Sequence, residues 1–246
     1  MAESVLLLSL EGFIQSWGMR SRWDVRDTGL EPTKSGVIGL LGCAMGLSRN
    51  APELEWLDKV LLFGVRIDRL GVVSTDFHTV TGYHRTAAGD FKHSGGTAKS
   101  LAKAQEHGES TIVSPHDYLH DAAFLVGLSV KPEYKAENHD LLERLAEYLR
   151  NPKWPLYLGR KACVPSRPIL ERLACEYDSL ESAFESEPWT GHRFKSELPA
   201  KLHAWIECQD GKYERQDAIR VNQLRFYDYR RCMRIEIDTS SLRRIA

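Results

Sequence analysis

Four short apolar runs and two helical segments alternate along the first two thirds of the chain, and their order is the strongest constraint on the fold. The runs have the length and aliphatic composition of strands and lie at residues 4–10, 60–68, 122–130 and 154–158. A first helix is predicted to start at Thr33 or Ser35, both good N-caps, and to end at Gly46. A second helix, with leucines along one face, is predicted over 138–149.

This order is strand, helix, strand, then an insertion, then strand, helix, strand, which is the split βαβ pattern of ferredoxin-like and RNA-recognition-motif-like folds. The insertion, from about 70 to 117, is polar, with a short helix predicted near 98–106. We therefore predict an α+β fold in which residues 1–165 form a ferredoxin-like domain with an inserted arm. A smaller C-terminal β-rich region is predicted over 166–246. Its strands are predicted at 201–208 and 232–237.

Length and composition indicate an ordinary globular protein. With 246 residues, of which 42% are hydrophobic and 27% charged, the chain can bury a core without disulfides. Its five cysteines form an odd count without a C-x-x-C pair, which fits reduced thiols better than bridges or a zinc site. No apolar run reaches the roughly 18 residues that span a bilayer. The N-terminus also lacks the features of a secretory signal, so we expect a cytoplasmic protein without membrane contact.

Charge is balanced overall but unevenly distributed. The formal net charge is -1, from 33 basic and 34 acidic residues, which neither demands nor excludes an anionic partner. Basic residues gather at 19–34, 78–107, 153–172 and 225–234, whereas 174–190 holds five acidic residues and no Lys or Arg. This distribution predicts a basic face and a separate acidic loop.

The most informative segment is Pro-Thr-Lys-Ser-Gly-Val-Ile-Gly-Leu-Leu-Gly at 32–42. Free backbone N–H groups at a helix start, together with Lys34, suit a phosphate group. Three glycines spaced three residues apart leave a smooth stripe where another backbone can approach, although tight packing of helix on sheet explains the stripe equally well. Thr28 and Thr33 occupy the glycine positions of a nucleotide-binding P-loop, which excludes ATP or GTP binding here.

Two other stretches place cations where RNA could bind. Residues 15–23 set Trp17 beside Arg20, and single-stranded RNA is commonly held by stacking bases on aromatic rings while arginines bind phosphates. A core tryptophan with solvated arginines explains the same residues. Arg160 and Lys161 follow the last strand predicted for the ferredoxin-like domain, where a ligand surface is common.

Histidines suggest two catalytic alternatives. His116 and His120 have the spacing of a zinc helix, but no metalloprotease Glu and no third ligand accompany them. Lys92 and His93 could cleave RNA without a metal, the histidine acting as acid or base and the lysine stabilising the phosphorane. Their Gly-rich setting favours arm surface instead. We expect no catalytic residue, no metal and no cofactor.

Five motifs occur in a fixed order and spacing. They are Gln-Ser-Trp-Gly at 15–18, the helix at 32–46, Asp-Phe-His-Thr-Val at 76–80, Tyr-Leu-His-Asp-Ala-Ala-Phe at 118–124 and Tyr-Leu-Gly-Arg-Lys at 157–161. Together they closely resemble the CasD family, the Cas-five subunits of the type I-E CRISPR Cascade antiviral surveillance complex. A weaker likeness at 190–192 and 215–234 extends the resemblance over most of the chain.

The resemblance implies a repeat-associated RNA-binding fold with a thumb at about 70–117. It also implies a non-catalytic subunit that anchors the 5′ handle of the CRISPR RNA and contacts the Cascade backbone and large subunits. Target DNA would be reached only through the complex. The implied RNA-binding residues are Gln15, Trp17, Arg20, Thr33, Lys34, Ser35, Gly36, Gly39, His78, Arg160 and Lys161.

Similar proteins of the type I-C system cleave precursor CRISPR RNA with a set of Tyr, Lys and His. That set is incomplete here, because no tyrosine precedes Tyr83, although Lys92 and His93 are present. We therefore predict RNA binding without cleavage, and the alternative is a metal-independent endoribonuclease that processes precursor CRISPR RNA.

Overall fold

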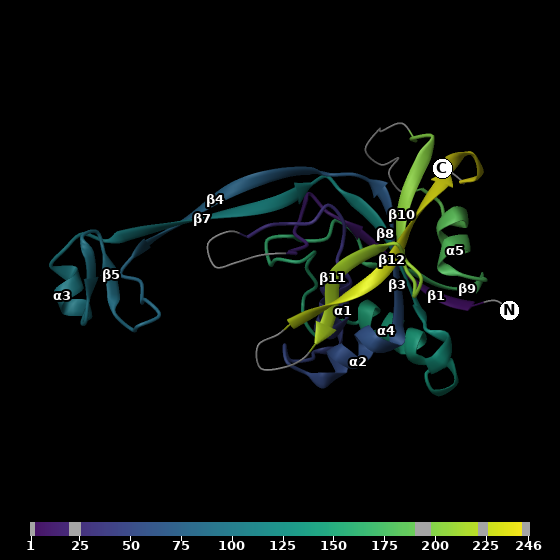
Figure 1. Cartoon of the computed structure of the whole chain (residues 1–246), viewed down its shortest axis with the longest axis horizontal. Coiled ribbons are helices and arrows are strands. Elements are labelled where there is room, and N and C mark those ends of the chain that lie inside the picture. The colour runs from purple at the N-terminus through teal and green to yellow at the C-terminus, as the bar shows by residue number, and fades with distance from the viewer. Residues whose placement is uncertain (1–2, 20–25, 190–197, 221–225, 243–246) are drawn as a thin grey trace.

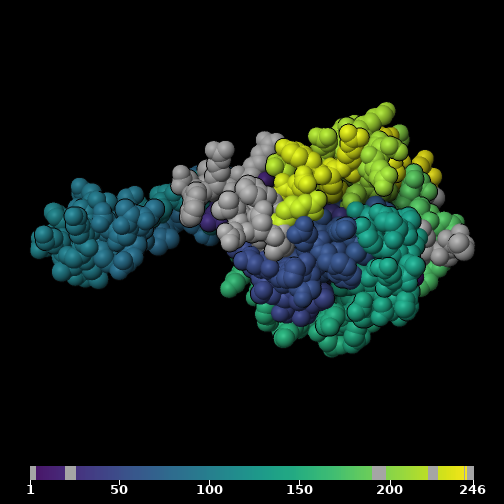
Figure 2. Space-filling view, turned by 60° about the horizontal axis from the view of Figure 1, so that its bottom comes forward, coloured from purple at the N-terminus to yellow at the C-terminus, as the bar shows by residue number. Residues whose placement is uncertain are grey.

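The computed structural model is a mixed α/β protein made mostly of strands, with few helices. It describes residues 3–19, 26–189, 198–220 and 226–242. A globular body carries one long arm (Figures 1 and 2). Over the described ranges, no helix is long and apolar enough to cross a membrane.

One antiparallel sheet forms the body. Its strands within the described residues are β1 (Glu3–Glu11), β3 (Leu61–Arg69), β8 (Ala123–Val130), β9 (Leu170–Tyr177), β10 (Lys201–Glu207), β11 (Tyr213–Arg220) and β12 (Phe226–Asp238). They lie in the order β11-β12-β10-β3-β8-β1-β9. The strands predicted for β1, β3, β8, β10 and the second half of β12 are thus confirmed.

The strand β1 has both faces buried, as its run rich in Val and Leu predicts. Leu6, Leu8 and Leu10 belong to one core cluster, whereas Val5 and Leu7 belong to a second cluster on the opposite face. Alternate residues of a strand point to opposite faces, so this one strand contributes to both cores.

Helices cover both faces of the sheet (Figure 1). The helices of the described residues are α1 (Lys34–Met45), α2 (Pro52–Val60), α3 (Leu101–Gln105) in the arm, α4 (Leu141–Arg150), α5 (Leu180–Ser186) and the 3-10 helices η1 (Pro132–Glu137) and η3 (Thr239–Ser241). Residues of α1, α2 and α4 join the cluster of Leu6, whereas α5 joins that of Val5. The predicted limits of α1 are confirmed, because Thr33 caps its start and Gly46, with φ 73°, caps its end.

The predicted insertion is the arm. Strands β4 (Val72–Gly82) and β7 (Ser110–His120) pair along their whole length, and β2 (Ile14–Gln15) joins the base of β7. The tip holds β5 (Phe91–His93), β6 (Gly96–Ala98) and α3. The short helix predicted near 98–106 is therefore present, although most of the arm is strand.

Two local predictions are wrong. Residues 154–158 form no strand; Pro155 lacks a donor for a ladder, and the strand beside β1 is β9, further along the chain. The acidic segment at 174–190 is no separate loop, because its described residues belong mainly to the end of β9 and to α5. The sequence patterns also missed α2, α5 and β11. All the C-terminal strands extend the same sheet, and the boundary at residue 165 stays a prediction.

Candidate nucleic-acid interface

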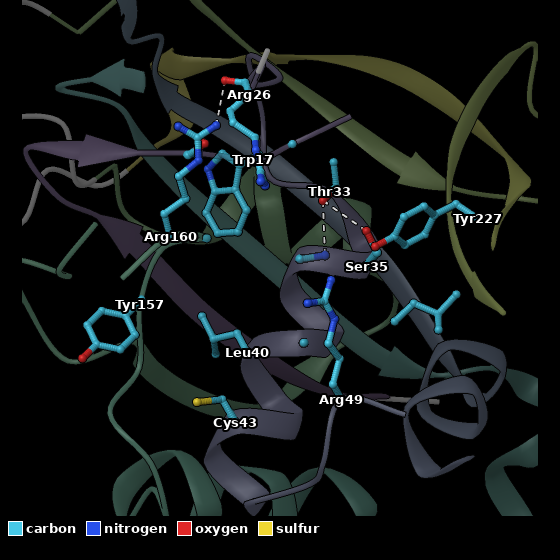
Figure 3. A pocket seen from close by; sticks show the side chains of 16 residues that line it. Trp17, Arg26, Thr33, Ser35, Leu40, Cys43, Arg49, Tyr157, Arg160 and Tyr227 are labelled. Atoms are coloured by element: carbon cyan, nitrogen blue, oxygen red, sulfur yellow. Dashed lines mark hydrogen bonds between the residues drawn. The ribbon is translucent and has the colours of Figure 1, made fainter. Parts of the chain in front are cut away.

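A cavity of about 490 Å³ opens beside the first turns of α1 (Figure 3), and we call it the α1 groove. It is lined by Ser16, Trp17, Gly18, Arg26, Thr33, Ser35, Gly36, Gly39, Leu40, Cys43, Arg49, Tyr157, Gly159, Arg160, Ile219 and Tyr227. Among these described residues three are arginines and none is a carboxylate. The lining is therefore cationic and suits an anionic ligand.

Trp17 is a fixed part of the wall of the α1 groove. Its indole is 1% exposed, and its Nε1 donates to Oε1 of Gln15 at 2.9 Å. The buried Gln15 amide donates in turn to the carbonyls of Leu10 and Ala122 at 3.2 and 2.9 Å. The prediction that Trp17 stacks on bases and that Gln15 touches RNA does not fit this burial. Both residues instead hold the wall in place.

The glycine stripe of α1 divides between two environments. Gly36 and Gly39 line the α1 groove, and a Cβ at Gly39 would meet nothing within 4 Å. A Cβ at Gly42 would lie 2.5 Å from a methyl carbon of Leu54, where α1 packs on α2. Both explanations of the stripe therefore apply, each to different glycines.

The start of α1 is already capped within the protein. The Thr33 hydroxyl accepts from the N–H of Gly36 at 3.2 Å, and the N–H of Lys34 donates to the Asp217 carboxylate at 2.7 Å. The Ser35 hydroxyl faces the groove, 3.4 Å from that of Thr33 (Figure 3). The prediction of free N–H groups is thus wrong for Gly36 and Lys34, because internal acceptors occupy them.

The Lys34 side chain lies outside the α1 groove. It is 1% exposed and reaches a second cavity of about 600 Å³. Its Nζ lies 2.8 Å from Oε2 of Glu207 and donates to the carbonyl of Asp58 at 2.6 Å. Burial lowers the pKa of Lys34, and the charges of Glu207 and Asp58 oppose that shift. In this geometry the ammonium binds internal acceptors, and its predicted contact with a phosphate stays a prediction.

Arg160 does line the groove (Figure 3), and it binds three backbone carbonyls from two segments of the chain. Its guanidinium donates to the carbonyls of Asp117, Arg26 and Asp27 at 3.1, 2.7 and 3.2 Å. It also stacks on Tyr118, with 4.9 Å from its central carbon to the ring centre. These contacts fix the position of one cation on the groove wall.

A glycine brings Arg160 to this place. Gly159 has φ 97°, and a Cβ there would collide with the backbone carbonyl of Ser16, so a side chain is excluded by both conformation and space. The next residue, Lys161, is exposed and is not among the lining residues.

His78 lies on the arm, and its ring belongs to a row of three rings with His116 and Tyr118. Its ring stacks on His116 at 4.0 Å and lies 6.4 Å from Tyr118, the ring that carries Arg160. Asp76 pairs with His78 at 3.0 Å. Burial lowers the pKa of His116, and nearby His and Arg side chains add to the effect, which favours a neutral imidazole there.

Several groove residues were not predicted. Arg26, Arg49, Tyr157 and Tyr227 all line the cavity. Arg26 falls within a basic stretch of the sequence, which was a usable signal. Arg49 follows α1 in a turn without other cations, so no pattern marks it. The predicted Arg20 lies outside the described residues.

The catalytic alternatives gain no support from the geometry. Lys92 and His93 lie on β5 at the tip of the arm, where His93 stacks on His107. His116 and His120 lie on one strand, about 13 Å apart at 3.3 Å per residue, too far to share an ion. In the described part of the chain, no group of three or more His, Cys, Asp or Glu could hold a metal.

Known proteins resemble this chain over nearly its whole length. A family model described as CRISPR-associated protein (Cas_Cas5) matches residues 5–232. The CRISPR system Cascade subunit CasD of Escherichia coli (strain K12) is 28% identical over 216 residues, which cover 84% of this chain and 88% of that protein.

Solved structures agree. One described as "Crystal structure of Cas protein" matches with a TM-score of 0.67 and 32% identity, covering 98% of each chain. A chain of a "CRISPR RNA-guided surveillance complex" matches with a TM-score of 0.71 and 31% identity, covering 97% of this chain and 92% of that one. The chain therefore belongs to the Cas5 family of CRISPR-associated proteins, as the five sequence motifs predicted.

Proposed function

We propose that this chain is a non-catalytic RNA-binding subunit of a CRISPR Cascade complex. The observation that carries the proposal is the α1 groove, a cationic cavity that brings together Thr33, Ser35, Gly36, Gly39 and Arg160 from among the predicted residues. The relatives named as a Cascade subunit and as a surveillance complex support the same role.

In this proposal the groove anchors the 5′ handle of the CRISPR RNA. Arg26, Arg49 and Arg160 neutralise phosphates, whereas Tyr157 and Tyr227 offer rings to unstacked bases. The open surface at Gly39 lets the nucleotide backbone approach α1.

We further propose that the core of the molecule is a ferredoxin-like unit. Four of its strands lie in the order β9-β1-β8-β3, and the helices α1 and α4 that follow β1 and β8 belong to one core cluster. The unit then extends through β9, with the arm at about 70–117 as its thumb and β10–β12 as the C-terminal region.

The proposal assigns the arm to protein contacts as well. Phe77, Val80 and Val113 are more than half exposed there, which is typical of a surface that meets a partner. In the assembled complex, the chain would contact the Cascade backbone subunit and the large subunit. The complex would act in the cytoplasm and meet target DNA through its guide RNA.

A binding assay tests the function. The full chain is titrated with a labelled RNA that carries the 5′ handle of the host CRISPR repeat, in EDTA and at several salt concentrations. We expect binding with intact RNA. Replacing Arg160 by Ala should weaken binding about tenfold and flatten the salt dependence by about 0.7 in the log–log slope, because one phosphate contact is lost.

The matched control is Arg144→Ala, which removes an exposed arginine of α4 outside the groove and should leave both quantities unchanged. Site-specific cutting of the RNA would favour the endoribonuclease alternative instead. Absence of binding by the folded chain would contradict the proposal.

A further inference from the structure

We infer that Lys34 supports RNA binding without touching RNA, because a buried ion cluster around it positions the first turn of α1. We call this the Lys34 cluster. It consists of Lys34, Asp58, Lys131, Glu207, Asp217 and Arg230. The inference rests on the proposed function of the α1 groove and makes Lys34 a positioning residue.

The side chain of Lys34 joins three separate parts of the fold. Glu207, the last residue of β10, places one carboxylate oxygen 2.8 Å from Lys34 and the other 2.8 Å from Lys131, which follows β8. Asp58 of α2 accepts through its carbonyl at 2.6 Å, and its carboxylate lies 4.0 Å away. One buried cation therefore balances two carboxylates and links α1 with α2 and β10.

The backbone of Lys34 is held from another side. A bulge in β11 between Gln216 and Ala218 leaves Asp217 unpaired in the ladder. Its carboxylate accepts from the Lys34 N–H at 2.7 Å and from two nitrogens of Arg230 at 2.6 and 3.0 Å. A carboxylate at this point also stabilises the positive end of the helix. Both the backbone and the side chain of Lys34 are thus bound to C-terminal strands.

The turn that is held in this way forms the groove wall. Thr33, Ser35 and Gly36 flank Lys34 and line the α1 groove. Gly36 lies so close to Trp17 that a Cβ would come within 2.9 Å of the indole, which leaves the turn little room to move. A cluster that fixes Lys34 therefore fixes the shape of the groove, although its side chain opens to a different cavity.

Two variants separate positioning from direct contact. Lys34→Met removes the buried charge, so the Asp58 carboxylate loses Lys34 and Glu207 keeps only Lys131 as a cation. We expect handle-RNA binding by the full chain to weaken about tenfold, with an unchanged salt slope, because no phosphate contact is lost. Lys34→Met with Glu207→Gln removes both charges and should bind within about threefold of wild type.

A third variant leaves the lysine in place. Asp217→Asn removes the negative charge from the helix start, and we expect it to weaken RNA binding. A direct phosphate contact by this turn predicts the opposite, since removing a nearby carboxylate would strengthen binding. If Lys34→Met does not fold, RNA binding by Asp217→Asn still distinguishes positioning from a direct phosphate contact.

Hydrogen exchange gives a readout that needs no RNA. Amides at 35–40 should exchange faster in Lys34→Met and return towards the wild-type rate in the double variant. A double variant that binds as weakly as Lys34→Met, with a slope flattened by about 0.7, would overturn the inference in favour of a phosphate contact. Unchanged binding and exchange in folded Lys34→Met would also overturn it. Wild-type protein that binds no RNA would instead refute the proposed function, and exchange alone would then decide on the positioning.

Discussion

Single residues of α1 show how the groove surface is built. A mid-helix glycine usually costs about 0.5–1 kcal/mol of stability relative to alanine. At Gly36 the nearby Trp17 ring explains the absence of a side chain, but at Gly39 nothing in the protein occupies the space. The proposed function supplies a reason, because the RNA would fill that space.

Two matched substitutions test this difference. Gly39→Ala should raise the free energy of unfolding by about 0.5–1 kcal/mol and weaken binding of the handle RNA, because the methyl group enters the groove. Gly36→Ala should lower the free energy of unfolding by about 1–3 kcal/mol through overpacking against Trp17. Urea unfolding measures the free energy of unfolding, and fluorescence polarisation measures RNA binding. If Gly39→Ala and the larger Gly39→Leu both bind RNA as wild type does, RNA does not lie against this surface.

Sequence could identify the start of α1 but not the direction of each side chain there. The capping Thr33 and Gly46 are local signals, and both were recognised. The orientation of Lys34 depends on Glu207 and Asp217, which come from strands more than 170 residues further along the chain. The local sequence therefore predicts a phosphate contact for this lysine, whereas the fold places those two carboxylates next to it.

Among the elements, the arm depends least on the rest of the fold. All but the last residue of β4 are exposed, and the buried side chains Ala104 and His93 of the tip belong to neither core cluster of the body. Few apolar contacts therefore link the tip to the core. We expect the tip to unfold locally while the body stays folded.

Deleting the tip tests this independence. Residues 83–109 are removed, and a two-residue Asn-Gly turn joins the paired ends of β4 and β7. We expect the melting temperature of the body to change by no more than about 2 °C, since the deletion removes surface alone. Scanning calorimetry measures it. A much larger fall would show that the tip stabilises the body.

Elements with strong local patterns were predicted, and those with tertiary causes were not. The continuous apolar runs of β1 and β8 identify them as buried strands. The strand predicted at 154–158 is absent, because Trp154 is partly exposed and a proline interrupts the segment. The edge strand β9 instead mixes charged and apolar residues without alternation, so its strand character becomes clear only from its pairing with β1.

On the scale of the whole molecule, the C-terminal strands complete the same body. β10 pairs with β3, and the buried Arg66 of β3 donates to the carbonyls of Phe184, Glu187 and Pro188. Arg66 also pairs with Asp68 at 2.6 Å. Residues from both sides of position 165 thus share one core.

A truncated chain tests whether position 165 is a boundary of stability. Residues 1–165 lack β9 and β10, so β1 and β3 would each lose one paired neighbour. Arg66 would also lose its three carbonyl acceptors at 184–188 and keep only Asp68. We expect this chain to be unfolded or aggregated, whereas residues 1–242 give the native circular dichroism spectrum. A cooperative thermal transition for residues 1–165 would show an independent domain.

The central position of β1 has a consequence during protein synthesis. Its two neighbours, β8 and β9, leave the ribosome more than a hundred residues later. At usual elongation rates an aliphatic strand with two unpaired edges therefore waits on the order of ten seconds for its first partner. The exposed strand favours aggregation during that interval, and a slow stretch of codons before β8 would lengthen its exposure.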